Sequence, residues 1–172
     1  TQWARFDFEE VFVGPPGTRF FVGIASRKNN VGSPCISVYV RRNAIAPLGG
    51  DAGWVGIPSG IFDFAVEDLP VPGESVNIVL PIAGGIPANA VYRKFESTQG
   101  WFNFEIDDDN YVSSAAGTSA SCPAAGNSSY SEGLNQGDFC LQLTIKDGGA
   151  NDADGTVNGV VDDPGGLAVD DN

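Results

Sequence analysis

The sequence contains no histidine, and this absence removes the most common catalytic sites. Ser-His-Asp and Cys-His catalysis use an imidazole as the general base, so neither can be built from this chain alone. Histidine-based zinc and copper sites are excluded for the same reason. There is also no Walker motif, and no GxGxxG segment follows a strand and opens a helix. We therefore expect a protein that is not an enzyme, with glycoside hydrolysis by paired carboxylates as the least favoured alternative.

Methionine is also absent, and the chain begins at Thr1. These two features predict a processed or excised chain from which any leader has been removed. No apolar run approaches the roughly 20 residues that a membrane-spanning helix requires, so we expect no transmembrane segment in this chain.

Basic residues are scarce, with 9 Lys and Arg against 22 Asp and Glu, and the formal net charge is −13. Almost all of the acidic excess lies after residue 100, where Lys146 is the only basic residue. The phosphates of a nucleic acid would be repelled, so we expect no nucleic-acid partner. Such a charge attracts cations or a basic protein surface, although an acidic surface also serves simply to keep a protein soluble.

Only three cysteines occur, at positions 35, 122 and 140. Cys122 and Cys140 flank a segment rich in Gly, Ser and Asn, and a disulfide that closes a loop of this size adds about 3 kcal/mol of stability. We favour this pair, which implies an oxidising compartment. Cys35 is then left over, either buried and inert or paired with another molecule.

Alternation of apolar and polar residues dominates the sequence and predicts strands. The predicted strands cover 35–42, 61–66, 75–81, 101–107 and 139–146, with further candidates at 4–13 and 19–26. In the strand at 101–107, Phe102, Phe104 and Ile106 are expected to face inward. Short strands, Gly- and Pro-rich turns and the lack of a convincing amphipathic helix predict an all-β fold. The expected architecture is an antiparallel β-sandwich of the immunoglobulin-like or jelly-roll type, with a partly closed β-barrel as the alternative.

The length and composition, 172 residues with 42% hydrophobic side chains, suit one globular domain. We therefore predict a single β-sandwich domain over residues 1–172. The segment 67–75 is the best place for a domain boundary, but either half alone would offer few strands. Residues 50–59 are predicted to form a surface loop that carries Trp54.

Side chains that carry oxygen gather in two segments of the acidic half. The candidate ligands are Asp147, Asn151, Asp152, Asp154, Asn158, Asp162 and Asp163 in the main cluster, with Asp107 and Asp109 in a second. Calcium takes about six to eight oxygen ligands, and the stretch 152–155 (DADG) supplies alternate carboxylates followed by a turn. Ala150 stands where a standard calcium loop has an acidic or amide residue, and no glutamate closes the loop.

Two interpretations of the main cluster therefore stay open. It holds calcium or another hard cation, or its side chains form Asx turns by accepting hydrogen bonds from nearby backbone N–H groups. In either case its glycines are interpreted as turn positions, and Val160 and Val161 as a possible short strand.

Residues 75–166 carry longer motifs that resemble a known family. The most specific are GLNQGDFC before the strand at 139–146 and DGGANDADGTVNGVVDDPGG after it. Together they resemble the bacterial domain called choice-of-anchor U. The resemblance implies an exported, extracellular or cell-surface protein of a Gram-negative bacterium, with the domain near the C-terminus ahead of a sorting or anchoring signal. It also supports the pairing of Cys122 with Cys140.

Two classes of function fit these features. The first is a non-catalytic structural protein that self-associates into a homo-oligomer or a polymer such as a filament, fibre or surface layer. Its contacts would include strand donation by the run at 4–13, which carries Phe6 and Phe8. The alternative is an adhesin or carbohydrate-binding module that stacks a glycan on aromatic rings, with Trp54 as the best candidate for exposure.

Overall fold

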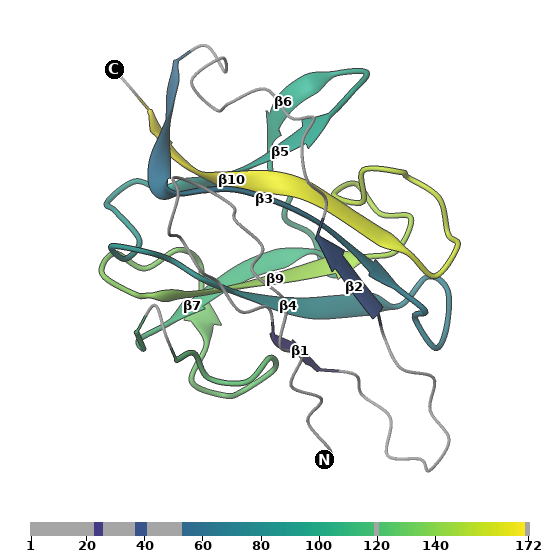
Figure 1. The fold of residues 1–172 in the computed structure, drawn as a ribbon, viewed down its shortest axis with the longest axis horizontal. Helices are drawn as coiled ribbons and strands as arrows, with labels where there is room; N and C mark the ends of the chain where they lie inside the picture. Colours follow the sequence, from purple (N-terminus) through teal and green to yellow (C-terminus); the bar gives the residue numbers. More distant parts are fainter. Residues whose placement is uncertain (1–22, 26–36, 41–52, 119–120, 171–172) are drawn as a thin grey trace.

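The computed structural model describes residues 23–25, 37–40, 53–118 and 121–170, which form strands and no helix. The strands are β1 (Gly23–Ala25), β2 (Ser37–Val40), β3 (Trp54–Glu67), β4 (Ser75–Pro81), β5 (Val91–Glu96), β6 (Gly100–Asn103), β7 (Tyr111–Ala115), β8 (Ser131–Glu132), β9 (Cys140–Lys146) and β10 (Val161–Asp170). Sheet A has the order β1-β4-β9-β7-β8 and sheet B the order β2-β3-β10-β5-β6. Neighbouring strands are antiparallel, and the two sheets face each other (Figure 1). The predicted β-sandwich is therefore confirmed, with two separate sheets instead of a closed barrel.

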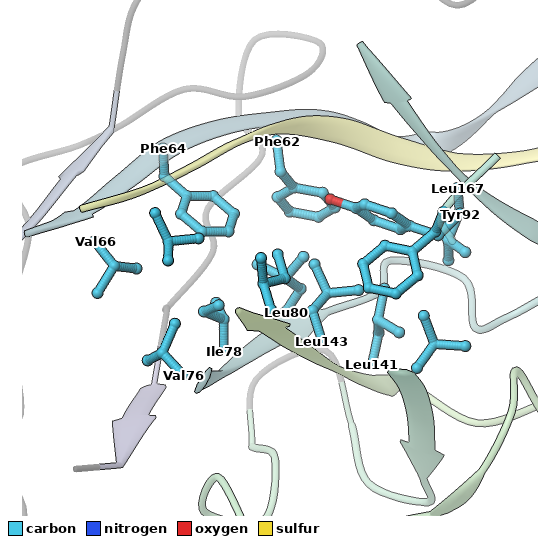
Figure 2. Close-up of a cluster of buried hydrophobic side chains, with 14 of the residues drawn as sticks. Phe62, Phe64, Val66, Val76, Ile78, Leu80, Tyr92, Leu141, Leu143 and Leu167 are labelled. Carbon is cyan, nitrogen blue, oxygen red and sulfur yellow. The ribbon is translucent and has the colours of Figure 1, made fainter. Parts of the chain in front are cut away.

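The hydrophobic core lies between the two sheets. Side chains from β3 in sheet B meet side chains from β4 and β9 in sheet A (Figure 2). The core residues from these three strands are Phe62, Phe64, Val66, Val76, Ile78, Leu80, Leu141, Leu143 and Ile145. Burial of each such side chain contributes about 1.5 to 3 kcal/mol. The strand predicted over 75–81 coincides with β4. The strand predicted over 139–146 starts one residue before β9 and ends with it.

The strand predicted over 101–107 ends earlier than expected. β6 stops at Asn103, and Ile106, predicted to face inward, is 68% exposed. Phe104 is buried as predicted, whereas Phe102 is only half-buried. The chain after β6 enters a turn closed by a 2.8 Å hydrogen bond from the N–H of Asp107 to the carbonyl of Asn110. The alternation of apolar and polar residues therefore does not predict burial at Ile106, which lies beyond the end of the strand.

The surface loop predicted for 50–59 is wrong from Trp54 onward, because β3 begins there. β10 pairs with residues 54–56 and 61–66 of β3, and the register shifts so that residues 57–60 lie between the two paired stretches. Proline lacks the N–H that a sheet ladder needs, and a bulge is one of the few positions that accept it. Pro58 lies in this irregular stretch, so the Gly- and Pro-rich sequence forms a bulge within a strand.

Strand β10 is much longer than the short strand suggested by Val160 and Val161. It runs through the segment DDPGG and occupies the centre of sheet B, between β3 and β5. A Cβ atom on Gly165 would lie 2.6 Å from Cε1 of Tyr92 and 2.7 Å from the carbonyl oxygen of Arg93. This glycine is therefore required by the close approach of β5, and its interpretation as a turn residue is wrong.

The segment predicted as a possible domain boundary connects the two sheets. β3 ends at Glu67 in sheet B, and β4 begins at Ser75 in sheet A. Residues before this segment supply β1 to sheet A and β2 and β3 to sheet B, where β1 pairs with β4 and β3 pairs with β10. Within the described ranges, no helix is long and apolar enough to cross a membrane.

The predicted disulfide between Cys122 and Cys140 is present, with Cα atoms 5.5 Å apart. Cys140 begins β9 and is fully buried, whereas Cys122 lies in the connection between β7 and β8. The bond therefore ties a long connection to a central strand of sheet A. Cys35, Phe6 and Phe8 lie outside the described residues.

Candidate functional site

Asp147 follows β9 directly, and its carboxylate is fully buried. Its Oδ2 accepts hydrogen bonds from the backbone N–H groups of Gly73 and Gly159, both at 2.7 Å, and its Oδ1 accepts one from Asn158 at 3.2 Å. Both glycines have positive φ angles, 87° and 83°, which favour glycine. One side chain thus joins the end of β9, the β3–β4 connection and the loop before β10 through charge-assisted bonds.

Asp152 joins the two ends of the loop between β9 and β10. Its Oδ2 accepts a 2.8 Å bond from the N–H of Gly148, and its Oδ1 accepts a 2.9 Å bond from the N–H of Asp162. The residue is only 5% exposed. Burial raises the pKa of Asp152 to about 6, because the loss of water disfavours the ionised form more than the backbone donors favour it.

Asn151 attaches the same loop to the segment that follows β6. Its Oδ1 accepts a 2.8 Å hydrogen bond from the N–H of Glu105, and its Nδ2 donates a 2.7 Å bond to the carbonyl of Glu105. The Asn151 side chain is fully buried. It satisfies both backbone groups of Glu105, as a neighbouring strand would.

Asp154 and Asn158 form local turns at the exposed tip of the loop. Asp154 Oδ1 accepts a 2.8 Å bond from the N–H of Thr156, and its Oδ2 accepts a 2.8 Å bond from Asn158 Nδ2. Asn158 Oδ1 in turn accepts a 2.8 Å bond from the N–H of Val160. These are the Asx-type contacts that were one of the two interpretations of the cluster.

Asp107 and Asp109 belong to a separate turn that contacts the end of β9. Asp107 Oδ1 accepts bonds from the N–H groups of Asp109 and Asn110, at 2.7 and 2.8 Å. The Asn110 side chain, followed by the Asp109 N–H, lowers the pKa of Asp107. Lys146 pairs with Asp109 at 2.5 Å, and its backbone N–H donates a 3.1 Å bond to Asn110 Oδ1.

Asp162 and Asp163 are neighbours on β10, but they have different environments. The backbone N–H of Asp162 donates to Asp152, which closes the loop. Asp163 points into the core, where it pairs with Lys94 of β5 and accepts a 3.1 Å bond from the hydroxyl of Tyr92. Burial, followed by the charge of Asp163, raises the pKa of Tyr92 well above its usual value.

The structure therefore distributes the predicted ligands instead of gathering them at one point. Among the described residues, no three Asp, Glu or Cys side chains are arranged as a metal site requires. Asp147, Asp152, Asp154 and Asn158 each accept bonds from backbone N–H groups. Calcium stays a prediction from the sequence. The Asx interpretation is confirmed for Asp154 and Asn158, each of which accepts from the N–H two residues ahead. Asp147 and Asp152 instead accept from backbone N–H groups four to 74 positions away.

Trp54, the predicted exposed aromatic residue, is half-buried at the start of β3. The guanidinium of Arg93 lies 4.8 Å from its ring centroid. On the same face of β5, the ring of Phe95 packs edge to face against Trp101, with centroids 5.2 Å apart. Within the described residues, the indole Nε1 of Trp101 is buried without a hydrogen-bond partner. Sheet B thus has an aromatic and cationic face opposite to the core.

The sequence did not predict the buried group formed by Tyr92, Lys94 and Asp163. The run VYRKF places Tyr92 and Lys94 on one face of a strand by period-two alternation, which was the available signal. No family model, curated protein or solved structure matches this chain. The resemblance to the choice-of-anchor U domain therefore rests on the quoted motifs alone.

Proposed function

We propose that the protein is a non-catalytic structural component of an extracellular assembly. One observation carries this proposal: the acidic side chains that resemble ligands serve to hold the fold. Asp147, Asp152 and Asn151 each join segments that are distant in the sequence, and the disulfide ties the β7–β8 connection to β9. A sandwich with this many internal ties suits a building block that must stay folded outside the cell, where disulfides persist.

The edges of both sheets supply a route to self-association. β1 and β2, from the first 40 residues, lie at the edges of sheets A and B, beside β4 and β3 (Figure 1). β1 pairs with three of the seven residues of β4, and β2 pairs with the four residues at the end of β3. Such short edge strands are suited to exchange between copies, because the same backbone hydrogen bonds form with a strand from a neighbour.

Electron microscopy of the purified protein tests this function. We expect oligomers or filaments. The protein is imaged both with calcium and with a chelator, because calcium is the cation that the sequence predicts. A synthetic peptide of residues 1–25 should shorten the assemblies by occupying the edge of β4, and a scrambled peptide is the matched control. A strictly monomeric particle under both conditions would contradict the proposal.

A second candidate is a glycan-binding module, favoured by the aromatic and cationic face of sheet B. Aromatic rings stack on sugars, and the half-buried Trp54 ring lies on this face against the guanidinium of Arg93. A glycan array with the wild type, Trp54→Ala and Tyr111→Ala tests it, because Tyr111 is an exposed aromatic residue of sheet A. Binding that is lost in Trp54→Ala and kept in Tyr111→Ala supports this function. The absence of binding to any glycan counts against it.

A further inference from the structure

Lys94 and Asp163 form an ion pair inside the core of the sandwich. Both side chains have zero exposed area, and Lys94 Nζ contacts Asp163 Oδ1. The hydroxyl of Tyr92 donates a 3.1 Å hydrogen bond to the other oxygen, Asp163 Oδ2. Lys94 and Asp163 come from adjacent antiparallel strands, since Lys94 of β5 is the register partner of Gly165 on β10.

The surroundings of this pair are apolar. On β5, Tyr92 lies on the same side as Lys94 and packs edge to face against Phe104, with ring centroids 6.1 Å apart. On β10, Val161 and Leu167 are fully buried in the same core (Figure 2 labels Leu167 beside Tyr92). Removing two charges from water costs several kcal/mol per ion, which their attraction offsets only in part. Proton transfer within the pair gives a neutral amine beside a neutral carboxylic acid, and these are the two reactants of amide formation.

We propose that Lys94 and Asp163 are joined by an intramolecular isopeptide bond. The lone pair of Nζ attacks Cγ of the protonated Asp163 carboxyl, and the new C–N bond replaces the bond from Cγ to the oxygen that leaves as water. The nitrogen gives up one proton, and the leaving oxygen gains one. The products are one amide and one water, so the step needs neither an oxidant nor a co-reactant.

The fold supplies two conditions for this condensation that are absent in aqueous solution: a fixed contact between the two groups and the exclusion of water. Holding two groups in contact in a fixed orientation gives an effective concentration of about 10⁵ M or more. The core also excludes the water that would drive the reverse hydrolysis. Tyr92 is placed to relay the proton, because its hydroxyl is bonded to Oδ2, the oxygen that leaves. It donates its proton to that oxygen and receives the proton that the nitrogen releases.

The cross-link would fasten the centre of sheet B. It joins β5 to β10, the central strand of that sheet, across 69 positions of sequence. The disulfide between Cys122 and Cys140 lies within this interval, so the two covalent ties are nested. The cross-link stands independently of the proposed function, because its chemistry depends on the core alone.

Intact mass spectrometry of the reduced, denatured full chain tests the proposal directly. We expect a mass lower by one water than the mass of the sequence. Tandem mass spectrometry after proteolysis should identify a branched peptide that joins a fragment with Lys94 to a fragment with Asp163. A chain with the full sequence mass, or one with two separate linear fragments, overturns the proposal.

Two variants separate this bond from other losses of water. A cyclic imide at the Asp154-Gly155 step also releases water, but it would persist in Lys94→Arg, whereas the isopeptide bond cannot form there. Tyr92→Phe removes the proton relay, and we expect the lighter species to appear at least about 100-fold more slowly, as for loss of a general acid-base group. An unchanged rate in Tyr92→Phe overturns the role of Tyr92. If Lys94→Arg fails to fold, the branched peptide of the wild type still decides whether the bond exists.

Discussion

The carboxylate of Asp147 accepts a 2.7 Å hydrogen bond from the backbone N–H of Gly159, and the same oxygen accepts an equal bond from Gly73. This relationship explains why an acidic, glycine-rich segment forms a folded loop. The negative charge is directed inward onto N–H groups of the chain, and the glycines allow those groups to converge.

Asp147→Asn should lower the free energy of unfolding by about 3 kcal/mol, because hydrogen bonds to a charged acceptor contribute about 1.5 to 3 kcal/mol each. The amide also cannot accept at both of its polar atoms. Chemical denaturation measures the change. Asp108→Asn removes the same charge from an exposed position and should change stability by less than about 0.5 kcal/mol. Equal effects of the two substitutions would show that net charge, and not these bonds, is responsible.

Asp152 should make stability depend on pH in the opposite sense to a typical paired carboxylate. Its pKa in the folded protein is about 6, above its ordinary value of 3.8, so the folded state binds the proton more tightly than the unfolded chain. Its contribution to stability is therefore greatest below pH 3.8 and is lost as the pH rises through 6. Denaturation midpoints from pH 3 to 8 should show this loss in the wild type and not in Asp152→Asn. A constant difference between the two proteins at every pH would contradict it.

The sequence predicted the parts of the fold whose signal is local. Alternation located β4 and β9, and the spacing of Cys122 and Cys140 indicated the disulfide. Alternation did not identify β5, because that strand places Lys94 in the core and Arg93 on the opposite face. A basic residue in the core is stable only beside its partner, and Asp163 lies 69 positions away in the sequence. No local pattern contains that information.

The same limit applies to the candidate site. The sequence predicted that these acidic and amide residues belong to a folded segment, but it could not identify the groups that they contact. Gly73 lies 74 positions before Asp147, and Glu105 lies 46 positions before Asn151. These contacts depend on how the two sheets stack, so both interpretations of the cluster fitted the sequence equally well.

Removal of the disulfide should lower the free energy of unfolding by about 3 kcal/mol, as expected for a closed loop of this length. The double variant Cys122→Ser/Cys140→Ser leaves no free thiol at either position. Denaturation with and without a reducing agent measures the effect. The wild type should lose stability in reductant down to the level of the variant, whose own stability should not respond. A wild type that is insensitive to full reduction would refute this role.

Gly165→Ala should destabilise the protein by about 3 kcal/mol, in the upper range for overpacking, because the new Cβ would collide with the backbone of β5 at Arg93. Gly84→Ala is the comparison, since its φ is +83° and no atom lies within 4 Å of its Cβ position. That variant should lose only about 1 to 2 kcal/mol from backbone strain. Thermal or chemical denaturation ranks the two. A smaller loss in Gly165→Ala than in Gly84→Ala would mean that β5 and β10 are not in close contact there.

Hydrogen exchange of the backbone amides, measured with a chelator present, tests most directly whether the acidic segment is held by its own carboxylates. The N–H groups of Gly73, Gly148, Gly159 and Asp162 donate to Asp147 or Asp152, so they should exchange as slowly as the amides of β9. In Asp147→Asn, protection should fall at Gly73 and Gly159 and persist at Gly148 and Asp162. Amides that exchange at unfolded rates until calcium is added would contradict this account and identify a cation as the group that organises the segment.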